Sequence, residues 1–134
     1  MKEELIQCWI ELTATIKNNR VTKRVSYNEA IILNYAYHAY LNNEGLYMQE
    51  IIKKTKMLKS LCNRTINLLM DKGFLRRELD GNQVIVYLNP DKVNDYLEIH
   101  QETFAYLKPV FEILEEKDQM DFIRIAQKIL RRLA

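Results

Sequence analysis

The chain has 134 residues, of which 48% are hydrophobic and 28% are charged, with a formal net charge of +2. This length suits one domain with its own core, and the composition excludes a disordered chain and a disulfide-rich scaffold. No apolar run approaches the roughly 18 residues of a membrane span, and the N-terminus is no signal peptide, so we expect a cytoplasmic protein without a membrane partner.

Helical periodicity begins at the N-terminus. One apolar stripe predicts a helix over about 3–17. The stripe consists of Leu5, Cys8, Trp9, Leu12 and Ile16. A polar connection over 18–23 follows. Ser26 and Glu29 then form a capping box, Ser-x-x-Glu, which predicts the start of a second helix that reaches about Tyr40.

The middle of the chain reads as a helix-turn-helix. A loop over 42–45 precedes a short helix over about 48–54 and a longer helix over 58–72, which has two distinct faces. The expected apolar face consists of Leu58, Cys62, Ile66 and Leu69. The opposite face carries polar and basic side chains, which contact both phosphates and base edges in DNA. Its members are Lys59, Ser60, Asn63, Arg64 and Asn67.

A two-stranded hairpin is expected directly after this helix. Gly73 ends the helix, because glycine adopts the left-handed conformation at little cost. An apolar and basic run over 74–79 leads to Asp80-Gly81, a pair typical of tight hairpin turns. Apolar residues then alternate along the return strand, at Val84, Val86 and Leu88. A helix-turn-helix followed by such a wing points to DNA.

The charge is segregated along the sequence. Residues 53–78 hold eight basic and two acidic side chains, a local charge of +6, whereas the remainder carries −4. A basic element on a mildly acidic body is typical of nucleic-acid readers, although such side chains also simply solvate a surface. The cations expected to hold phosphates are Lys53, Lys54, Lys56, Arg76 and Arg77.

The C-terminal third is helical and unusually apolar. Asn89-Pro90 is a strong start signal for a helix of about 25 residues. Its apolar arc is too wide to cover one small domain, which favours contact with a second copy of the chain. Pro109 should bend or break this helix, and Asp118 should cap a final one. The residues expected at the dimer interface are Leu5, Trp9, Leu97, Phe104, Leu107, Phe111, Phe122 and Ile129.

These elements, in this order, resemble the MarR family of bacterial transcription regulators over nearly the whole chain. Three local matches carry the resemblance. Asn63-Arg64 fits the family's Thr-Arg in the recognition helix, Lys72-Gly73-Phe74-Leu75 fits its helix-ending run, and Asp80 with Leu88 fits the spacing of its wing. The resemblance implies a homodimer, joined through its terminal helices, that binds pseudo-palindromic operators in double-stranded DNA. It also implies release from DNA by a small phenolic or lipophilic effector or by an oxidant.

The sequence departs from the family pattern at three positions. Asn82 stands where the wing has an arginine, so minor-groove contact by the wing tip is weakened. Leu58 stands where the recognition helix usually has a small polar cap. Leu88-Asn89 replaces Leu-Thr, which exchanges one capping residue for another.

Cysteine, histidine and aromatic residues are the remaining candidate site residues. Cys8 occupies the helix in which peroxide-sensing relatives carry a reactive cysteine, but Leu12 replaces their tyrosine, and a buried, inert thiol is the simpler expectation. Cys62 is expected in the core. His38 and His100 have no companions at metal-ligand spacing, so neither a metal nor another cofactor is expected. His100 should be hydrogen-bonded near the dimer interface, and a pH-sensing role is the alternative.

The aromatic run over 35–40, together with Trp9 and Phe104, suits either core packing or the lining of an effector pocket, and packing is the simpler reading. No nucleophile motif, phosphate loop or acid–base pair is found, so we expect no enzymatic activity.

The sequence thus predicts a mainly α, single-domain protein over 1–134. Residues 26–89 form a winged helix-turn-helix with a two-stranded wing, and 1–18 and 90–134 form dimerisation helices. The predicted function is transcription regulation, most simply repression. The alternative is a winged-helix adaptor, of plasmid or phage type, that binds a protein partner instead of reading DNA. Salt-sensitive binding to duplex DNA separates the two.

Overall fold

The computed structural model describes residues 1–18 and 24–134, so most of the connection predicted over 18–23 lies outside the described residues. The chain divides into two compact units, residues 1–99 and 100–134. No helix among the described residues is both long and apolar enough to span a membrane.

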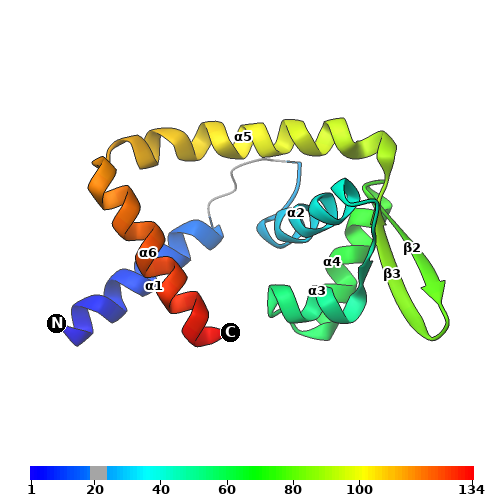
Figure 1. The fold of residues 1–134 in the computed structure, drawn as a ribbon, viewed down its shortest axis with the longest axis horizontal. Helices are drawn as coiled ribbons and strands as arrows, with labels where there is room; N and C mark the ends of the chain where they lie inside the picture. Colours follow the sequence, from blue (N-terminus) through cyan, green and yellow to red (C-terminus); the bar gives the residue numbers. More distant parts are fainter. Residues whose placement is uncertain (19–23) are drawn as a thin grey trace. The chain divides into compact units, whose positions relative to one another are not determined.

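The first unit contains helices and a small antiparallel sheet (Figure 1). Its elements are α1 (Lys2–Asn18), α2 (Tyr27–Leu41), β1 (Leu46–Tyr47), α3 (Met48–Thr55), α4 (Lys59–Asp71), β2 (Leu75–Asp80), β3 (Gln83–Leu88), the 3₁₀ helix η1 (Pro90–Lys92) and the start of α5 (Val93–Glu112). The second unit holds the rest of α5 and α6 (Glu116–Leu133). A mainly α winged helix-turn-helix is therefore confirmed.

The sheet has three strands in the order β1-β3-β2, whereas the sequence predicted two. Leu46 pairs with Val86 and Tyr47 with Ile85, so β1 extends the hairpin on its far edge. A strand of two residues is too short to show the alternation by which strands are recognised, because that pattern needs at least four positions.

The wing turn lies one residue later than predicted. Asp80 pairs with Gln83 across the hairpin, so the two central turn residues are Gly81 and Asn82. Gly81 has φ +64°, and Asn82 is not among the residues with positive φ. A positive φ at the first central position alone is typical of a type II′ turn, which places glycine there. The Asp-Gly signal marked the hairpin correctly but not its centre.

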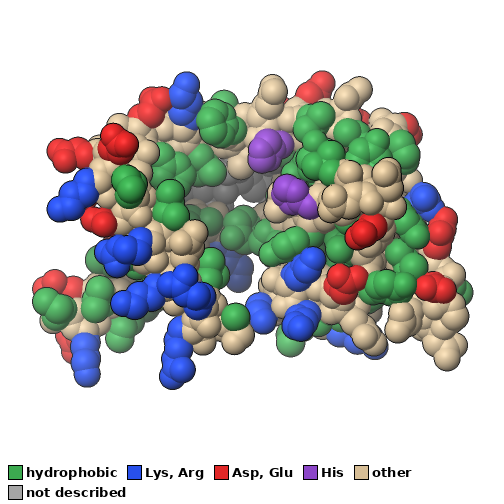
Figure 2. Space-filling view, in the orientation of Figure 1, with side chains coloured by type: hydrophobic (Ala, Val, Ile, Leu, Met, Phe, Trp, Pro, Cys, Tyr) green, Lys and Arg blue, Asp and Glu red, His purple; other side chains and the backbone are tan. Residues whose placement is uncertain are grey.

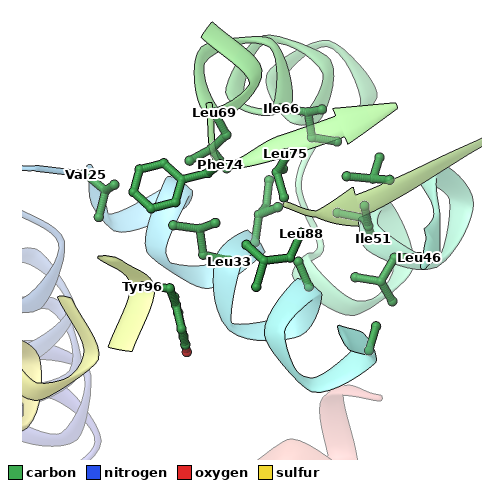
Figure 3. Packing of buried hydrophobic residues seen from close by; sticks show 14 of the residues in the cluster. Val25, Leu33, Leu46, Ile51, Ile66, Leu69, Phe74, Leu75, Leu88 and Tyr96 are labelled. Carbon is green, nitrogen blue, oxygen red and sulfur yellow. The ribbon is translucent and has the colours of Figure 1, made fainter. Parts of the chain in front are cut away.

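The core of the first unit forms where α2, α3 and α4 pack with β3 (Figure 3). Leu33 of α2, Ile51 of α3, and Ile66 and Leu69 of α4 are fully buried. Leu58 was expected on the same face, but its side chain is 76% exposed, so this prediction was wrong. It precedes the first helical residue of α4, and the helical spacing used to place it does not hold outside the helix.

The C-terminal end of α4 has the hydrogen bonds of a Schellman motif. Phe74 N–H donates to the Leu69 carbonyl at 2.9 Å, and Gly73 N–H donates to the Met70 carbonyl at 2.9 Å. Gly73 has φ +83°, which glycine adopts without the steric cost of a Cβ atom. The predicted helix stop at this glycine is confirmed.

An ion pair joins α2 to the end of α4. Lys72 Nζ lies 2.7 Å from Glu29 Oε2 and donates to the Arg24 carbonyl at 3.1 Å. The Glu29 side chain is 5% exposed and also accepts from Ser26 N–H at 3.0 Å, while Ser26 Oγ accepts from Glu29 N–H at 3.2 Å, which confirms the capping box. Burial alone would raise the pKa of the Glu29 carboxyl, but the hydrogen bonds from Lys72 and Ser26 outweigh it and lower the pKa below its ordinary 4.5.

The C-terminal helices differ in detail from the sequence expectation. A 3₁₀ turn precedes α5, and Pro109 lies inside α5, which ends three residues later, so the proline does not break the helix. α6 starts at Glu116, and Asp118 lies in its first turn rather than at its cap. Instead, Gln119 Nε2 donates to the carbonyls of Phe111 and Leu114, both at 3.0 Å, and so satisfies acceptors at the end of α5.

The Glu29 pair predicts a specific acid dependence of stability. Because the folded-state pKa of Glu29 is depressed, its ionised form stabilises the fold above the unfolded pKa, and this contribution is lost as pH falls through the folded value. Glu29→Gln should lower the free energy of unfolding at neutral pH by about 1–3 kcal/mol, since it leaves Lys72 without its charged partner. Urea unfolding between neutral and acidic pH should show a smaller loss of stability on acidification for the variant than for the wild type.

The control is Glu44→Gln, at an exposed carboxylate in the loop after α2. This variant should follow the wild-type pH curve. Parallel curves for wild type and Glu29→Gln would contradict the assignment.

Candidate nucleic-acid interface

The turn between α3 and α4 fixes where the second helix begins. Lys56 has φ +61°, a left-handed conformation that reverses the chain, and its N–H donates to the Ile52 carbonyl at 3.0 Å. Thr55 Oγ1 accepts from Met57 N–H at 3.3 Å, and the Met57 side chain is buried. A buried methionine on a rigid turn anchors the start of α4 to the core.

The polar face of α4 is exposed as the sequence predicted. Lys59, Ser60, Arg64 and Asn67 are exposed, and Asn63 is half-buried. Cys62, Thr65, Ile66 and Leu69 on the other face are buried. Within the described part of the chain, Arg64 makes no side-chain hydrogen bond or ion pair, so its guanidinium has all its donors available for a ligand.

The lysines of α3 extend this cationic surface. Lys53 and Lys54 are exposed, as is Lys56 in the turn. Lys54 Nζ also lies 5.6 Å from the centre of the Tyr35 ring, which holds the ammonium group by a weak cation–π contact. Figure 2 shows lysine and arginine side chains over α3.

The two wing arginines point to opposite faces of the sheet, because they are neighbours on β2. Arg76 lies opposite Tyr87, stacks on its ring at 4.3 Å and pairs with Glu78. Arg77 lies opposite Val86, on the face that carries the buried residues of the sheet and against which α4 packs. Only Arg77 therefore shares the α4 side of the wing.

The wing is also fixed to β1. Tyr47 donates its hydroxyl to Asp80 Oδ2 at 3.0 Å, and this hydrogen bond to a carboxylate raises the pKa of Tyr47. Asp80 is thereby held at the base of the turn, and Asn82 is exposed at its tip. Tyr47 was not predicted from the sequence, because a two-residue strand carries no pattern that indicates a hydrogen-bond partner 33 residues away.

Asn89 does not cap the helix that follows it. Its side chain makes no capping hydrogen bond; instead Nδ2 donates to the Gly73 carbonyl at 2.7 Å. Its backbone N–H donates to the Phe74 carbonyl at 2.8 Å. The predicted exchange of one capping residue for another was therefore wrong: Asn89 joins the end of α4 to the start of the C-terminal helical segment.

Comparison with solved structures identifies the architecture. BldR from Sulfolobus solfataricus, a transcriptional regulator, aligns with a TM-score of 0.81 at 21% identity, over 98% of this chain and 95% of that chain. A MarR-family regulator from Rhodococcus sp. RHA1 aligns with a TM-score of 0.79 at 14% identity, over 95% and 93%. The Staphylococcus aureus MepR–DNA complex aligns with a TM-score of 0.77 at 13% identity, over 100% and 99%.

The chain has the MarR fold. Compared by sequence alone, it matches no protein-family model and no curated protein. In this fold α3 and α4 form the helix-turn-helix and β2–β3 forms the wing.

The apolar side chains of the terminal helices are exposed to solvent in the single chain. All eight residues predicted at the dimer interface are exposed, between 36% for Leu107 and 64% for Leu5. Within the 100–134 unit, Phe111 and Phe122 pack against each other with ring centres 5.9 Å apart.

The two thiols lie in different surroundings. Cys8 is exposed in the single chain, contrary to the buried thiol expected there. Cys62 is buried as predicted, and its burial raises the pKa of the thiol, which makes it a poor nucleophile.

The aromatic run of α2 packs against the core. Tyr35, Tyr37 and Tyr40 are partly buried, and Tyr37 stacks on Tyr96 with ring centres 4.7 Å apart. Tyr96 donates its hydroxyl to Asn34 Oδ1 at 3.3 Å. These contacts account for most of the run as packing. His38 and His100 are both exposed.

Asn89→Ser distinguishes two possible roles of this side chain: capping the helix that follows it, and donating a hydrogen bond to the Gly73 carbonyl. Serine is an excellent helix cap, so the substitution would be neutral if capping were the role of this residue. Because serine is too short to replace the amide donor to Gly73, we expect a loss of about 1 kcal/mol in the free energy of unfolding, measured by urea denaturation. Asp91→Ser, at an exposed position in the same 3₁₀ turn, is the control and should change little. A wild-type midpoint for Asn89→Ser would contradict the assignment.

Proposed function

We propose that this chain is a sequence-specific DNA-binding transcription regulator that acts as a homodimeric repressor. The observation that carries the proposal is the α4 surface, whose exposed donors make no ion pair with any residue that the structure describes. The cations of α3 lie beside it, and Arg77 lies on the same side of the wing. Such a surface suits phosphate positioning at its edges and base reading along its centre. The likeness to the MepR–DNA complex supports the same function.

In this proposal α4 enters the major groove and Arg64 makes the main base contact. An arginine fork matches the O6 and N7 acceptors of guanine, and asparagine matches the N6 and N7 edge of adenine. Asn67 is exposed for such a contact, whereas Asn63 is half-buried and has less reach. Lys59 and Ser60 are the first two residues of α4 and are exposed beside this surface. Lys53, Lys54 and Lys56 bind phosphates.

The wing makes a smaller contribution than the resemblance implied. Arg76 is engaged by Glu78 and Tyr87, so it offers less charge to a phosphate than Arg77 does. Asn82 at the tip is short and uncharged, and an uncharged residue gains little from the negative potential of a narrow minor groove. Operator choice therefore rests mainly on α4.

Dimerisation completes the proposal. Residues of α1, α5 and α6 leave large side chains in water, among them Trp9, Phe104 and Phe122. A second copy covers such a surface by symmetry and presents two α4 helices to successive half-sites of a pseudo-palindromic operator. Release by a small phenolic or lipophilic effector, which the family resemblance implies, is part of the same proposal.

The alternative function is that of an adaptor that binds a protein partner. The exposed apolar helices favour it, because large unpaired apolar surfaces mark protein interfaces of any kind. A protein partner on these apolar helices would leave the cationic surface around α4 without a role. Binding to duplex DNA that weakens steeply with salt supports the regulator, and its absence supports the adaptor.

Substitutions of Arg64 and Arg77 should change DNA binding in different ways if Arg64 contacts a base and Arg77 contacts a phosphate. Arg64→Ala should cost about 1–3 kcal/mol on the selected operator and relax the preference at one position in each half-site. Arg77→Ala should weaken all duplexes alike and reduce the slope of log affinity against log salt by about one unit per chain. Fluorescence anisotropy over a salt series measures both.

Arg76→Ala is the matched control, since its guanidinium is already paired, and it should change the salt slope less than Arg77→Ala. An unchanged operator preference for Arg64→Ala would show that α4 does not read this base.

Phe104→Asp tests the dimer. Because Phe104 is 63% exposed in the single chain, the substitution costs the monomer fold little, but it places a charge in the proposed interface. Light scattering should give about twice the 16.0 kDa chain mass for the wild type and the single mass for the variant. Leu41→Asp, at a similarly exposed leucine of α2, should leave the mass doubled. A wild-type chain that is monomeric at micromolar concentration would contradict the proposed dimer.

A further inference from the structure

Leu58 is exposed at the start of α4, although large apolar side chains usually lie inward. Its side chain is 76% exposed, and it directly follows the buried Met57. The left-handed backbone of Lys56 sets this turn. As a result the Met57 side chain points into the core and the next side chain, Leu58, points to solvent. The exposure of Leu58 is therefore built into the turn.

The fold gains nothing from leucine at this position. Leu58 is the N-cap of α4, with φ −62° and ψ 147°, and its side chain makes no capping hydrogen bond. Its carbonyl accepts the first helical bond, from Cys62 N–H at 2.9 Å, as any residue would allow. Serine, threonine, aspartate or asparagine would stabilise the helix better, because their side-chain oxygens accept from the first free N–H groups. A local rule broken without structural compensation is a sign of function.

The surroundings of Leu58 are cationic and polar. Lys56 precedes it by two residues, Lys59 and Ser60 follow, and all three are exposed. It is therefore an apolar group at the edge of the surface assigned above to DNA. In helix-turn-helix proteins the first residues of the recognition helix approach base edges most closely. The major groove offers one apolar group to such a side chain, the C5-methyl group of thymine.

We propose that Leu58 is a specificity-determining residue that contacts a thymine methyl group in each half-site. This inference rests on the proposed function, since it requires α4 in the major groove. Leu58 exchanges helix capping for a contact that distinguishes thymine from the other three bases. It explains why the family's small polar cap is absent from this chain.

The test uses the operator duplex that the wild-type chain selects from a random-sequence pool. Each thymine is replaced in turn by deoxyuridine, which keeps all hydrogen-bonding groups and removes only the methyl group. At one position per half-site, the wild type should lose about fourfold in affinity, the effect of one methyl group transferred out of water. Replacing both symmetric thymines should cost about sixteenfold, because the two half-sites act independently.

Leu58→Ser should abolish this discrimination and bind the thymine and deoxyuridine duplexes equally. The same variant should melt at a higher temperature than the wild type, because serine caps α4. A structural defect would lower both stability and affinity, so the opposite signs separate a lost contact from misfolding. Leu41→Ser, the same change at a leucine exposed on α2, should keep the wild-type response to deoxyuridine.

Two results would overturn the inference while leaving the proposed function intact: an operator at which no deoxyuridine substitution weakens wild-type binding, or a Leu58→Ser variant that keeps the full loss. A protein partner on Leu58 would give the first of these. A wild-type chain that selects no duplex at all would overturn both the inference and the proposed function.

Discussion

The position of α4 depends on a set of polar contacts at its C-terminal end. The Lys72–Glu29 pair holds it to α2, and the Asn89 amide holds it to the segment that leads into α5. Gly73 lies between these two contacts, and its left-handed backbone ends α4 at this point. A helix that discriminates bases must be held to a fraction of an ångström, and these polar contacts add fixed points to the packing of its apolar face.

These contacts also change the electrostatics read from sequence. Residues 53–78 carry eight cations, but Lys72 is paired with Glu29 and Arg76 with Glu78. Six remain for a polyanion: Lys53, Lys54, Lys56, Lys59, Arg64 and Arg77. In the proposed complex each neutralised phosphate releases counterions, so these pairings reduce what residues 53–78 add to the salt dependence at each half-site. A count of basic residues overstates the available charge wherever carboxylates lie within reach in the fold.

Periodic features of this chain were predictable from sequence, and tertiary ones were not. The capping box at Ser26, the helix stop at Gly73 and the exposed face of α4 follow from local chemistry, and the structure has them. The sequence misplaced Leu58 because periodicity extends poorly beyond a helix end. It missed β1 because two residues carry no pattern. It misread Asn89 because a side chain's partner 16 residues away depends on a turn whose geometry local rules do not supply.

The same distinction applies to the candidate site. Residue types on a helical face identify which side chains are available, so the α4 row was found from spacing alone. Which residue of β3 lies opposite each arginine depends on the register of the hairpin, and the residue types of β2 alone do not give that register. Arg76 and Arg77 therefore looked equivalent in sequence. Their difference arises from Tyr87 and Glu78, neither of which stands out before the hairpin is paired.

The C-terminal unit places a further constraint on how this protein works. None of the side chains of residues 100–134 is buried in the single chain. Ordering a residue costs about 1–2 kcal/mol of conformational entropy, and two helices that leave most of their apolar side chains exposed offset little of that cost. Covering these side chains would stabilise the unit, and in the proposed dimer each copy covers the other. Folding of this unit and dimerisation are then one equilibrium.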